Sequence, residues 1–244
     1  MANDWTHKLG YVVPSWNTVV EYETTRMLPA GVSAHFSRIA HIDDSPASLR
    51  HMAEAFPASV ELLSHAKVDA VCYACTGASL FRGRRDDLAD IARLGSSGMP
   101  VISVAGALVD AAQHLGLSRV AVAAPYEKWL LGSLVAYLED AGLQVTNAVG
   151  LGEQANVQHS PQTAIDLALR AWTPGADGLI LSCGNFRSLE SLPEIERRIG
   201  KPLVGSNGAA LWSALTAVGW QGIVPNAGTL LNDVVRHTLS AVRA

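Results

Sequence analysis

Short apolar segments alternate along the chain with longer amphipathic ones. Runs rich in β-branched and other apolar residues predict strands at 9–14, 68–75, 99–104, 118–125, 176–183 and 201–206. Segments with helical periodicity predict helices at 43–66, 106–116, 127–142, 160–172 and 208–219. Several of these helices open after Asp or Ser and close at Gly, with Asp43 and Asp44 before the first. This alternation is typical of βαβ units around a parallel sheet and predicts an α/β fold.

The pattern also repeats within the chain. Three landmarks recur in the same order with separations of 102 to 111 positions: Pro14 with Pro125, Cys75 with Cys183, and Pro100 with Pro202. Such a register predicts two homologous halves, each a parallel sheet flanked by helices, with the active site in the cleft between them. The predicted units are residues 1–116 and 117–219, and the C-terminal segment 220–244 is expected to complete the first.

Two of the three cysteines lie where parallel strands are expected to end. Cys75 and Cys183 each follow an apolar run and precede small or polar residues. Ligands of open α/β sheets bind outside the carboxyl ends of the strands, so facing halves would direct both thiols into one cleft. Cys72 lies inside its predicted strand and corresponds to Ile180, so it is expected to fill the core.

Composition and charge narrow the class of partner. The chain has 244 residues, 49% of them hydrophobic, and a formal charge of −4 without a basic block. Binding to nucleic acid or an anionic membrane is therefore not expected, and a small-molecule partner is. The polar N-terminus, the lack of a long apolar run and the odd number of cysteines predict a cytoplasmic protein.

Motifs of other chemistries are not found in the sequence. The histidines form no H-E-x-x-H or similar ligand spacing, and C-x-x-C at Cys72–Cys75 neither opens a helix nor has a second pair. No G-x-G-x-x-G, P-loop or G-x-S-x-G motif is complete. The expectation is a pair of thiols that works without a metal or cofactor.

The segments "VVPSWNT", "YACTGAS", "AAPYE" and "LSCGN" together resemble the aspartate/glutamate racemase superfamily, most closely its maleate cis–trans isomerase and arylmalonate decarboxylase branch. The resemblance implies flavodoxin-like halves, a small carboxylate substrate and catalysis by Cys75 and Cys183. It also implies a substrate-binding role for Pro14 and Asn17 of the V-P-S segment and for Tyr126 after A-P. Asn156 matches a further carboxylate-binding asparagine more loosely.

The residues also suggest how the thiols could work. Both cysteines precede loop-to-helix transitions, where backbone N–H groups are expected to lower a thiol pKa. N–H groups around Thr76–Gly77 and Gly184–Asn185 could stabilise an enediolate. Without the resemblance, Asn17 would be interpreted as a helix N-cap and Tyr126 as a half-buried helix start.

Three functions remain open at this point. The favoured one is a cofactor-independent isomerase or racemase of a small carboxylic acid, in which Cys75 attacks or deprotonates and Cys183 donates a proton. The second is an arylmalonate-type decarboxylase that needs only Cys183 and a hydrophobic pocket; the resemblance implies glycine at the place of Cys75 in such enzymes. The third is a non-catalytic small-carboxylate binding protein. A homodimer or higher homo-oligomer is also expected.

Overall fold

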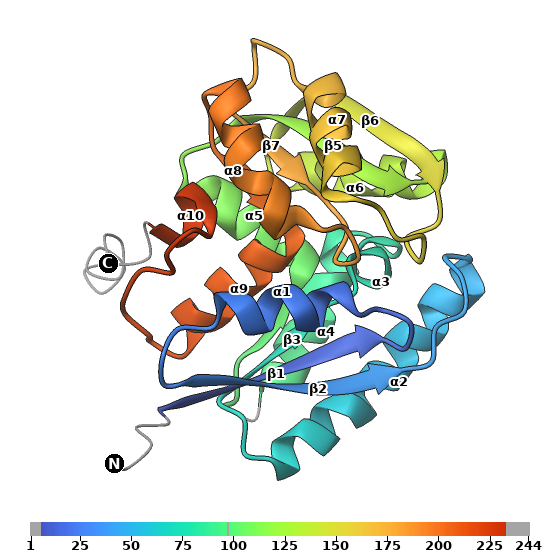
Figure 1. Ribbon diagram of the computed structural model, residues 1–244. Helices are drawn as coiled ribbons and strands as arrows, with labels where there is room; N and C mark the ends of the chain where they lie inside the picture. Colours follow the sequence, from blue (N-terminus) through green and yellow to red (C-terminus); the bar gives the residue numbers. More distant parts are fainter. Residues whose placement is uncertain (1–5, 97, 233–244) are drawn as a thin grey trace.

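The computed structural model describes residues 6–96 and 98–232 and contains two parallel four-stranded sheets (Figure 1). The first has the order β2-β1-β3-β4 and the second β6-β5-β7-β8. The strands of the first sheet are β1 (His7–Pro14), β2 (Val32–Ile39), β3 (Ala70–Tyr73) and β4 (Val101–Ser103). Those of the second are β5 (Arg119–Tyr126), β6 (Gln144–Glu153), β7 (Gly178–Leu181) and β8 (Leu203–Gly205). The identical strand order confirms the predicted pair of pseudo-symmetric α/β halves.

Helices cover both sheets. Those that follow the strands of the first sheet are α1 (Val19–Met27), α2 (Pro46–His65), α3 (Thr76–Leu80), α4 (Arg84–Gly95) and α5 (Val104–His114). Those that follow the strands of the second are α6 (Lys128–Asp140), α7 (Pro161–Ala171), α8 (Ser188–Ile199), α9 (Ser206–Ala217) and α10 (Gly228–Asn232). Three helices begin after a serine whose hydroxyl accepts a backbone N–H of the first turn, at Ser45, Ser103 and Ser160.

The two halves are joined by packing and by the chain itself. Helices α5 and α9 lie side by side in the middle of the molecule (Figure 1), and α9 also contacts α1, β3 and β4 of the first half. A single cluster of buried apolar residues extends through both sheets. Helix α10 packs on α8, α9 and β8, whereas residues 233–244 of the predicted completing segment lie outside the described residues. The assignment of segments to folding units stays a prediction.

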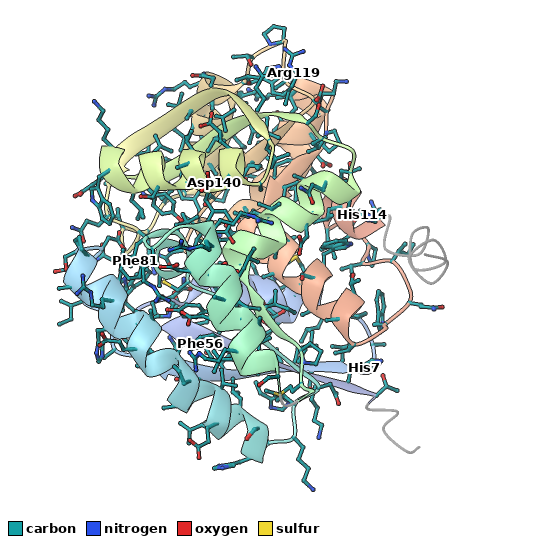
Figure 2. The ribbon with its side chains drawn as sticks, turned by 180° about the vertical axis from the view of Figure 1, so that it is seen from behind. His7, Phe56, Phe81, His114, Arg119 and Asp140 are labelled. Carbon is teal, nitrogen blue, oxygen red and sulfur yellow. The ribbon has the colours of Figure 1, made fainter. Side chains whose placement is uncertain are left out.

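The carboxyl ends of the central strands face the middle of the molecule. In Figure 2, Arg119, which begins β5, is labelled at the top, and His7, which begins β1, is labelled at the right in the lower half. The last residues of these two strands, Pro14 and Tyr126, line the same cavity. The fold therefore brings the ligand-binding edges of both sheets together.

The register supports the expected role of Cys72. Cys72 pairs with Tyr11 of β1, and Ile180 occupies the equivalent position in β7 opposite Val122 of β5. Cys72 is completely buried, so its thiol is core filling.

Within residues 6–96 and 98–232, no helix combines the length and apolar character that crossing a bilayer requires.

Candidate active site

Cys75 lies at the carboxyl end of β3. The strand ends at Tyr73, and the backbone N–H of Ala74 still donates to the carbonyl of Val12. Cys75 is then the N-cap of the short helix α3, in ordinary extended backbone with φ of −127°. Its carbonyl accepts both the N–H and the hydroxyl of Ser79, each at 3.1 Å. The turn thus holds the thiol at the mouth of the first sheet.

Cys183 occupies the equivalent place after β7 but in a different backbone conformation. Its φ is 119°, a region that residues with a side chain rarely adopt. The backbone N–H of Cys183 donates to the hydroxyl of Ser206 at 3.0 Å, and its carbonyl accepts the N–H of Phe186 at 3.1 Å. Contacts on both sides therefore hold this strained residue in place.

Both thiols line one small cavity between the halves. The predicted residues that share it are Pro14, Asn17, Cys75, Thr76, Gly77, Tyr126, Cys183, Gly184 and Asn185. Trp16, Asp44, Ala74 and Ala155 complete the lining. The cavity volume is about 20 Å³, which is room for a single water molecule. This volume is smaller than a four-carbon acid.

Asn17 and Tyr126 face this cavity from the ends of β1 and β5. The Asn17 Oδ1 atom accepts the N–H of Val20 at 3.0 Å, although the N-cap residue of α1 is Thr18 and not Asn17. Because that oxygen is occupied, the side-chain amide N–H groups are what Asn17 can offer to a carboxylate. Tyr126 is the last residue of β5, fully buried, with its hydroxyl 3.4 Å from that of Ser182. Its interpretation as a half-buried helix start is wrong.

Hydroxyl groups and small residues connect the two thiol loops. Thr76 Oγ1 lies 3.5 Å from Ser206 Oγ, the same hydroxyl that holds the N–H of Cys183. Gly184 is packed so closely that a Cβ atom there would lie 3.0 Å from Val20 and 3.3 Å from Asn207. Glycine at this position lets the Cys183 loop approach α1, which belongs to the other half.

Asn185 and Asn156 have different environments. Asn185 donates from Nδ2 to the carbonyl of Ala155 at 3.1 Å, and its buried Oδ1 has no hydrogen-bond partner within the described part of the chain. Asn156 is exposed and does not line the cavity, where its neighbour Ala155 stands instead. The structure therefore places Asn156 outside the cavity, in the loop that contributes Ala155 to its lining.

Asp44 is a cavity residue that the sequence pattern did not identify. It reads as part of a helix start, but Ser45 caps α2, and the Asp44 side chain is only 6% exposed. Its carboxylate accepts the N–H of Ala155 and lies 3.4 Å from Nε2 of His41. A carboxylate between a loop of each half is a polar feature that no local motif signals.

Burial controls the charge state of the thiols. It raises the pKa of Cys75 to about 12, against the opposing effect of the N–H groups of Ala78 and Gly77. It raises the pKa of Cys183 to about 12 as well, against the N–H of Asn185 and the hydroxyl of Tyr126. The donors expected from the sequence are present, but the expected net lowering is wrong. In the closed cavity both cysteines are thiols.

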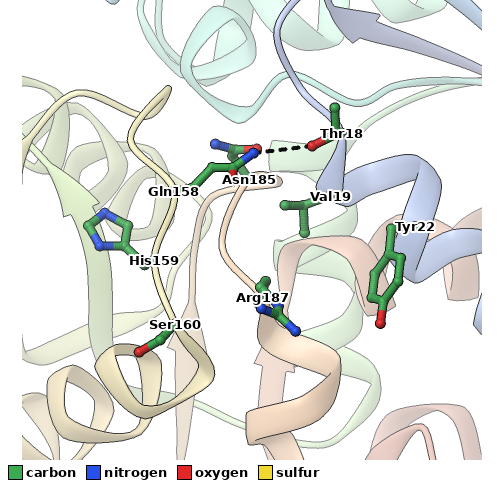
Figure 3. A pocket seen from close by; sticks show the side chains of 8 residues that line it. All are labelled: Thr18, Val19, Tyr22, Gln158, His159, Ser160, Asn185 and Arg187. Atoms are coloured by element: carbon green, nitrogen blue, oxygen red, sulfur yellow. Dashed lines mark hydrogen bonds between the residues drawn. The ribbon is translucent and has the colours of Figure 1, made fainter.

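A larger pocket of about 580 Å³ lies beside the cavity and shares Asn185 with it (Figure 3). Thr18, Val19 and Tyr22 line it from α1 and the residue before that helix, and Gln158 lines it from the loop after β6. Gln158 Nε2 donates to Thr18 Oγ1 at 3.3 Å, which joins the two halves (Figure 3). This position makes the larger pocket a vestibule next to the thiol cavity.

The described residues contain no group of three or more His, Cys, Asp and Glu side chains placed to hold a metal ion.

Two facing α/β halves with paired strand-end thiols define a class of two-cysteine enzymes, and comparison with known proteins agrees. The profile of the arylmalonate decarboxylase family matches residues 9–231, and the chain belongs to this family. A maleate isomerase of Pseudomonas putida is 32% identical over 93% of this chain and 97% of its own.

Solved structures give the same result. A liganded double mutant of arylmalonate decarboxylase superposes with a TM-score of 0.87 and 27% identity, covering 93% of this chain and all of the other. A cysteine-to-serine mutant of Nocardia farcinica maleate cis–trans isomerase, with a covalently bound succinylcysteine intermediate, has a TM-score of 0.84 and 28% identity over 93% and 98% of the two chains. These relatives fit a cysteine-based isomerase.

Proposed function

We propose that this protein is a cofactor-independent cis–trans isomerase of a small unsaturated carboxylic acid such as maleate. One observation carries the proposal: Cys75 and Cys183, from equivalent strand ends of two halves, line a single enclosed cavity. Groups that donate hydrogen bonds to a carboxylate, among them Asn17 and Tyr126, line the same space.

Cys75 is the attacking residue in this mechanism. Its sulfur forms a bond to one alkene carbon, and the π electrons move onto the carboxyl group of the other carbon to give an enediolate. Because burial keeps Cys75 protonated, its proton passes to an oxygen of that carboxyl group as the bond forms. N–H groups near Thr76 and Gly184 stabilise the negative charge that develops on oxygen.

Rotation and elimination complete the reaction. The former double bond is single in the adduct and rotates. The electron pair then returns to form the trans double bond, the carbon–sulfur bond breaks, and Cys75 recovers its proton. Cys183 can donate a proton to the enediolate carbon, which gives a resting thioether of the saturated acid. When Cys183 takes this proton back, the enediolate forms again.

The decarboxylase alternative is not favoured. It needs a pocket in which a carboxylate has no polar partner, whereas Asp44, Asn17, Thr76 and Asn185 each bring a polar group to this cavity. The binding-protein alternative gives no role to the paired thiols. A cytoplasmic location and a homo-oligomeric state stay predictions of the sequence.

Incubation with maleate, phenylmalonate and a panel of amino acids in D₂O, followed by NMR, tests the proposal. We expect maleate to become fumarate, without CO₂ release from phenylmalonate or exchange of amino-acid Cα protons. Rapid decarboxylation of phenylmalonate that persists in Cys75→Ala would overturn the proposal in favour of the decarboxylase.

A further inference from the structure

The mechanism above gives no role to Asp44, although its carboxylate lines the same cavity as both thiols. Its negative charge also raises the pKa of Cys75 and Cys183, in addition to the larger effect of burial. The Asp44 charge disfavours ionisation of both cysteines, although an ionised thiol is the stronger nucleophile or base. A carboxylate in this position is therefore expected to have a role in binding the substrate.

Hydrogen bonding holds Asp44 as an acceptor. Ser48 Oγ accepts the N–H of Ile42 at 3.4 Å and lies 3.0 Å from His41 Nδ1. The other ring nitrogen of His41, Nε2, lies 3.4 Å from Asp44 Oδ1 and donates to it in the tautomer that carries its proton there. Asp44 Oδ2 accepts the N–H of Ala155. A carboxylate has about four lone-pair sites, so two remain for a ligand.

A second acceptor lies beside the same residue. Asn185 donates to the carbonyl of Ala155, which fixes the orientation of its amide. Its Oδ1 is buried without a hydrogen-bond partner in residues 6–96 and 98–232. An unpaired buried acceptor is costly, so a ligand that donates a hydrogen bond here is favoured.

The charges that line the cavity also favour a substrate group that is uncharged and donates a hydrogen bond. None of its described lining residues is Lys or Arg. A dianion such as maleate would bring two negative charges next to Asp44 without a cationic partner, and unpaired charges are strongly disfavoured in a buried site. One substrate carboxylate can use the amide of Asn17 and the Trp16 Nε1–H, which is buried and unpaired within the described residues.

We propose that Asp44 and Asn185 select a substrate with one carboxylate and, at the other end, an uncharged group that donates a hydrogen bond, such as a primary amide. The half-amide of a cis-enedioic acid fits this description better than the dianion, so maleate is expected to react but to be the poorer substrate of the two. This assignment rests on the proposed function for the location of the substrate, and it narrows the class of acid.

Binding of saturated analogues tests the selection without catalysis. Calorimetry of the wild-type protein with succinate and succinamate should show succinamate binding at least about tenfold more tightly. Equal affinity, tighter binding of succinate, or no binding of either compound at millimolar concentration overturns the proposal. Since neither analogue has a double bond, this outcome is separate from whether the protein is an isomerase.

Kinetics with maleate and maleamate test the role of Asp44. The kcat/KM ratio of maleamate to maleate should fall at least about tenfold in Asp44→Asn, because the asparagine can donate to a carboxylate. Asp43→Asn is the matched control, since Asp43 bonds the N–H of Ser45 and does not line the cavity. A ratio unchanged in Asp44→Asn overturns the selection while leaving isomerisation intact. If that variant does not fold, the wild-type binding measurement decides.

Discussion

The hydroxyl of Ser206 accepts a hydrogen bond from the backbone N–H of Cys183, with nitrogen and oxygen 3.0 Å apart. Ser206 is the first residue of α9 and lies 3.5 Å from Thr76 Oγ1, beside Cys75. One side chain therefore links the backbone of one thiol loop to the loop of the other. Removal of the Ser206 hydroxyl would break this link between the two loops.

Ser206→Ala should lower both stability and turnover. The substitution leaves the buried N–H of Cys183 unpaired, which costs about 1–3 kcal/mol in the free energy of unfolding. Urea denaturation measures this loss, and Ser213→Ala on the same helix is the control, with an expected change within about 0.5 kcal/mol. Equal stability of the two variants would show that the Ser206 hydrogen bond does not support the loop.

Replacement by glycine rather than alanine should favour stability at Cys183 and disfavour it at Cys75. At φ of 119°, Cys183→Gly should be more stable than Cys183→Ala by about 1–3 kcal/mol, because glycine relieves the strain. At Cys75, with φ of −127°, alanine should be the more stable by about 0.5–1 kcal/mol. The four variants are compared by denaturation, and the same order at both positions would exclude strain at Cys183.

The raised thiol pKa values predict slow alkylation. Burial holds the pKa of Cys75 and Cys183 at about 12, and the cavity has no room for a reagent, so iodoacetamide should modify both thiols far more slowly in the folded than in the unfolded protein between pH 7 and about pH 9. Peptide mapping by mass spectrometry separates the sites. Equal rates in the folded and unfolded protein would contradict the effect of burial.

The same shift predicts alkaline instability. Folded thiols hold their protons more tightly than unfolded ones, so their contribution to stability is complete below about pH 8.5 and is lost as the pH rises towards 12. The loss should be smaller in Cys75→Ala than in the wild-type protein. Denaturation curves at pH 8 and 10 measure the difference, and identical losses would argue against ionisation of Cys75.

The stability contributed by Glu23 should depend on pH, and the stability contributed by Glu190 should depend on pH in the opposite direction. Its buried carboxylate joins α1 to Asn207 at 2.7 Å, and burial raises its pKa. The stability of the wild-type protein relative to Glu23→Gln should therefore rise as the pH falls from 7 towards 4.5. Arg187 lowers the pKa of the exposed Glu190, so the comparison with Glu190→Gln should move the other way below about pH 4.5. Parallel trends would contradict this assignment.

The central strands and the short edge strands β4 and β8 could be predicted from sequence, but the edge strands β2 and β6 could not. Strands β1, β3, β5 and β7 are almost continuous runs of buried residues, which produce a strong pattern. Strands β2 and β6 lie at the sheet edges and alternate little, with most of their residues only half-buried. Helix α8, which contains Pro193, was also missed. Edge position and tertiary packing decide these elements.

The site shows a similar division. Residues adjacent to strand ends, such as Cys75 and Cys183, follow from topology because parallel strands direct their carboxyl ends to one edge. Asp44 does not, since aspartate before a helix is usually a cap and only the tertiary fold turns it into the cavity. The sequence predicted a lowered thiol pKa, and this was wrong for a related reason. The local N–H donors can be recognised in the sequence, whereas the burial of the thiols in a closed cavity cannot.

Peptide mapping of Cys183→Ser after incubation with maleate or maleamate tests the central claim most directly. Once the enediolate carbon has taken up a proton, serine is too weak a base to remove it, so the thioether should accumulate, and the mass of one substrate should appear on the peptide that contains Cys75. Finding Cys75 unmodified in a preparation that still converts the cis to the trans acid would contradict nucleophilic attack by this residue.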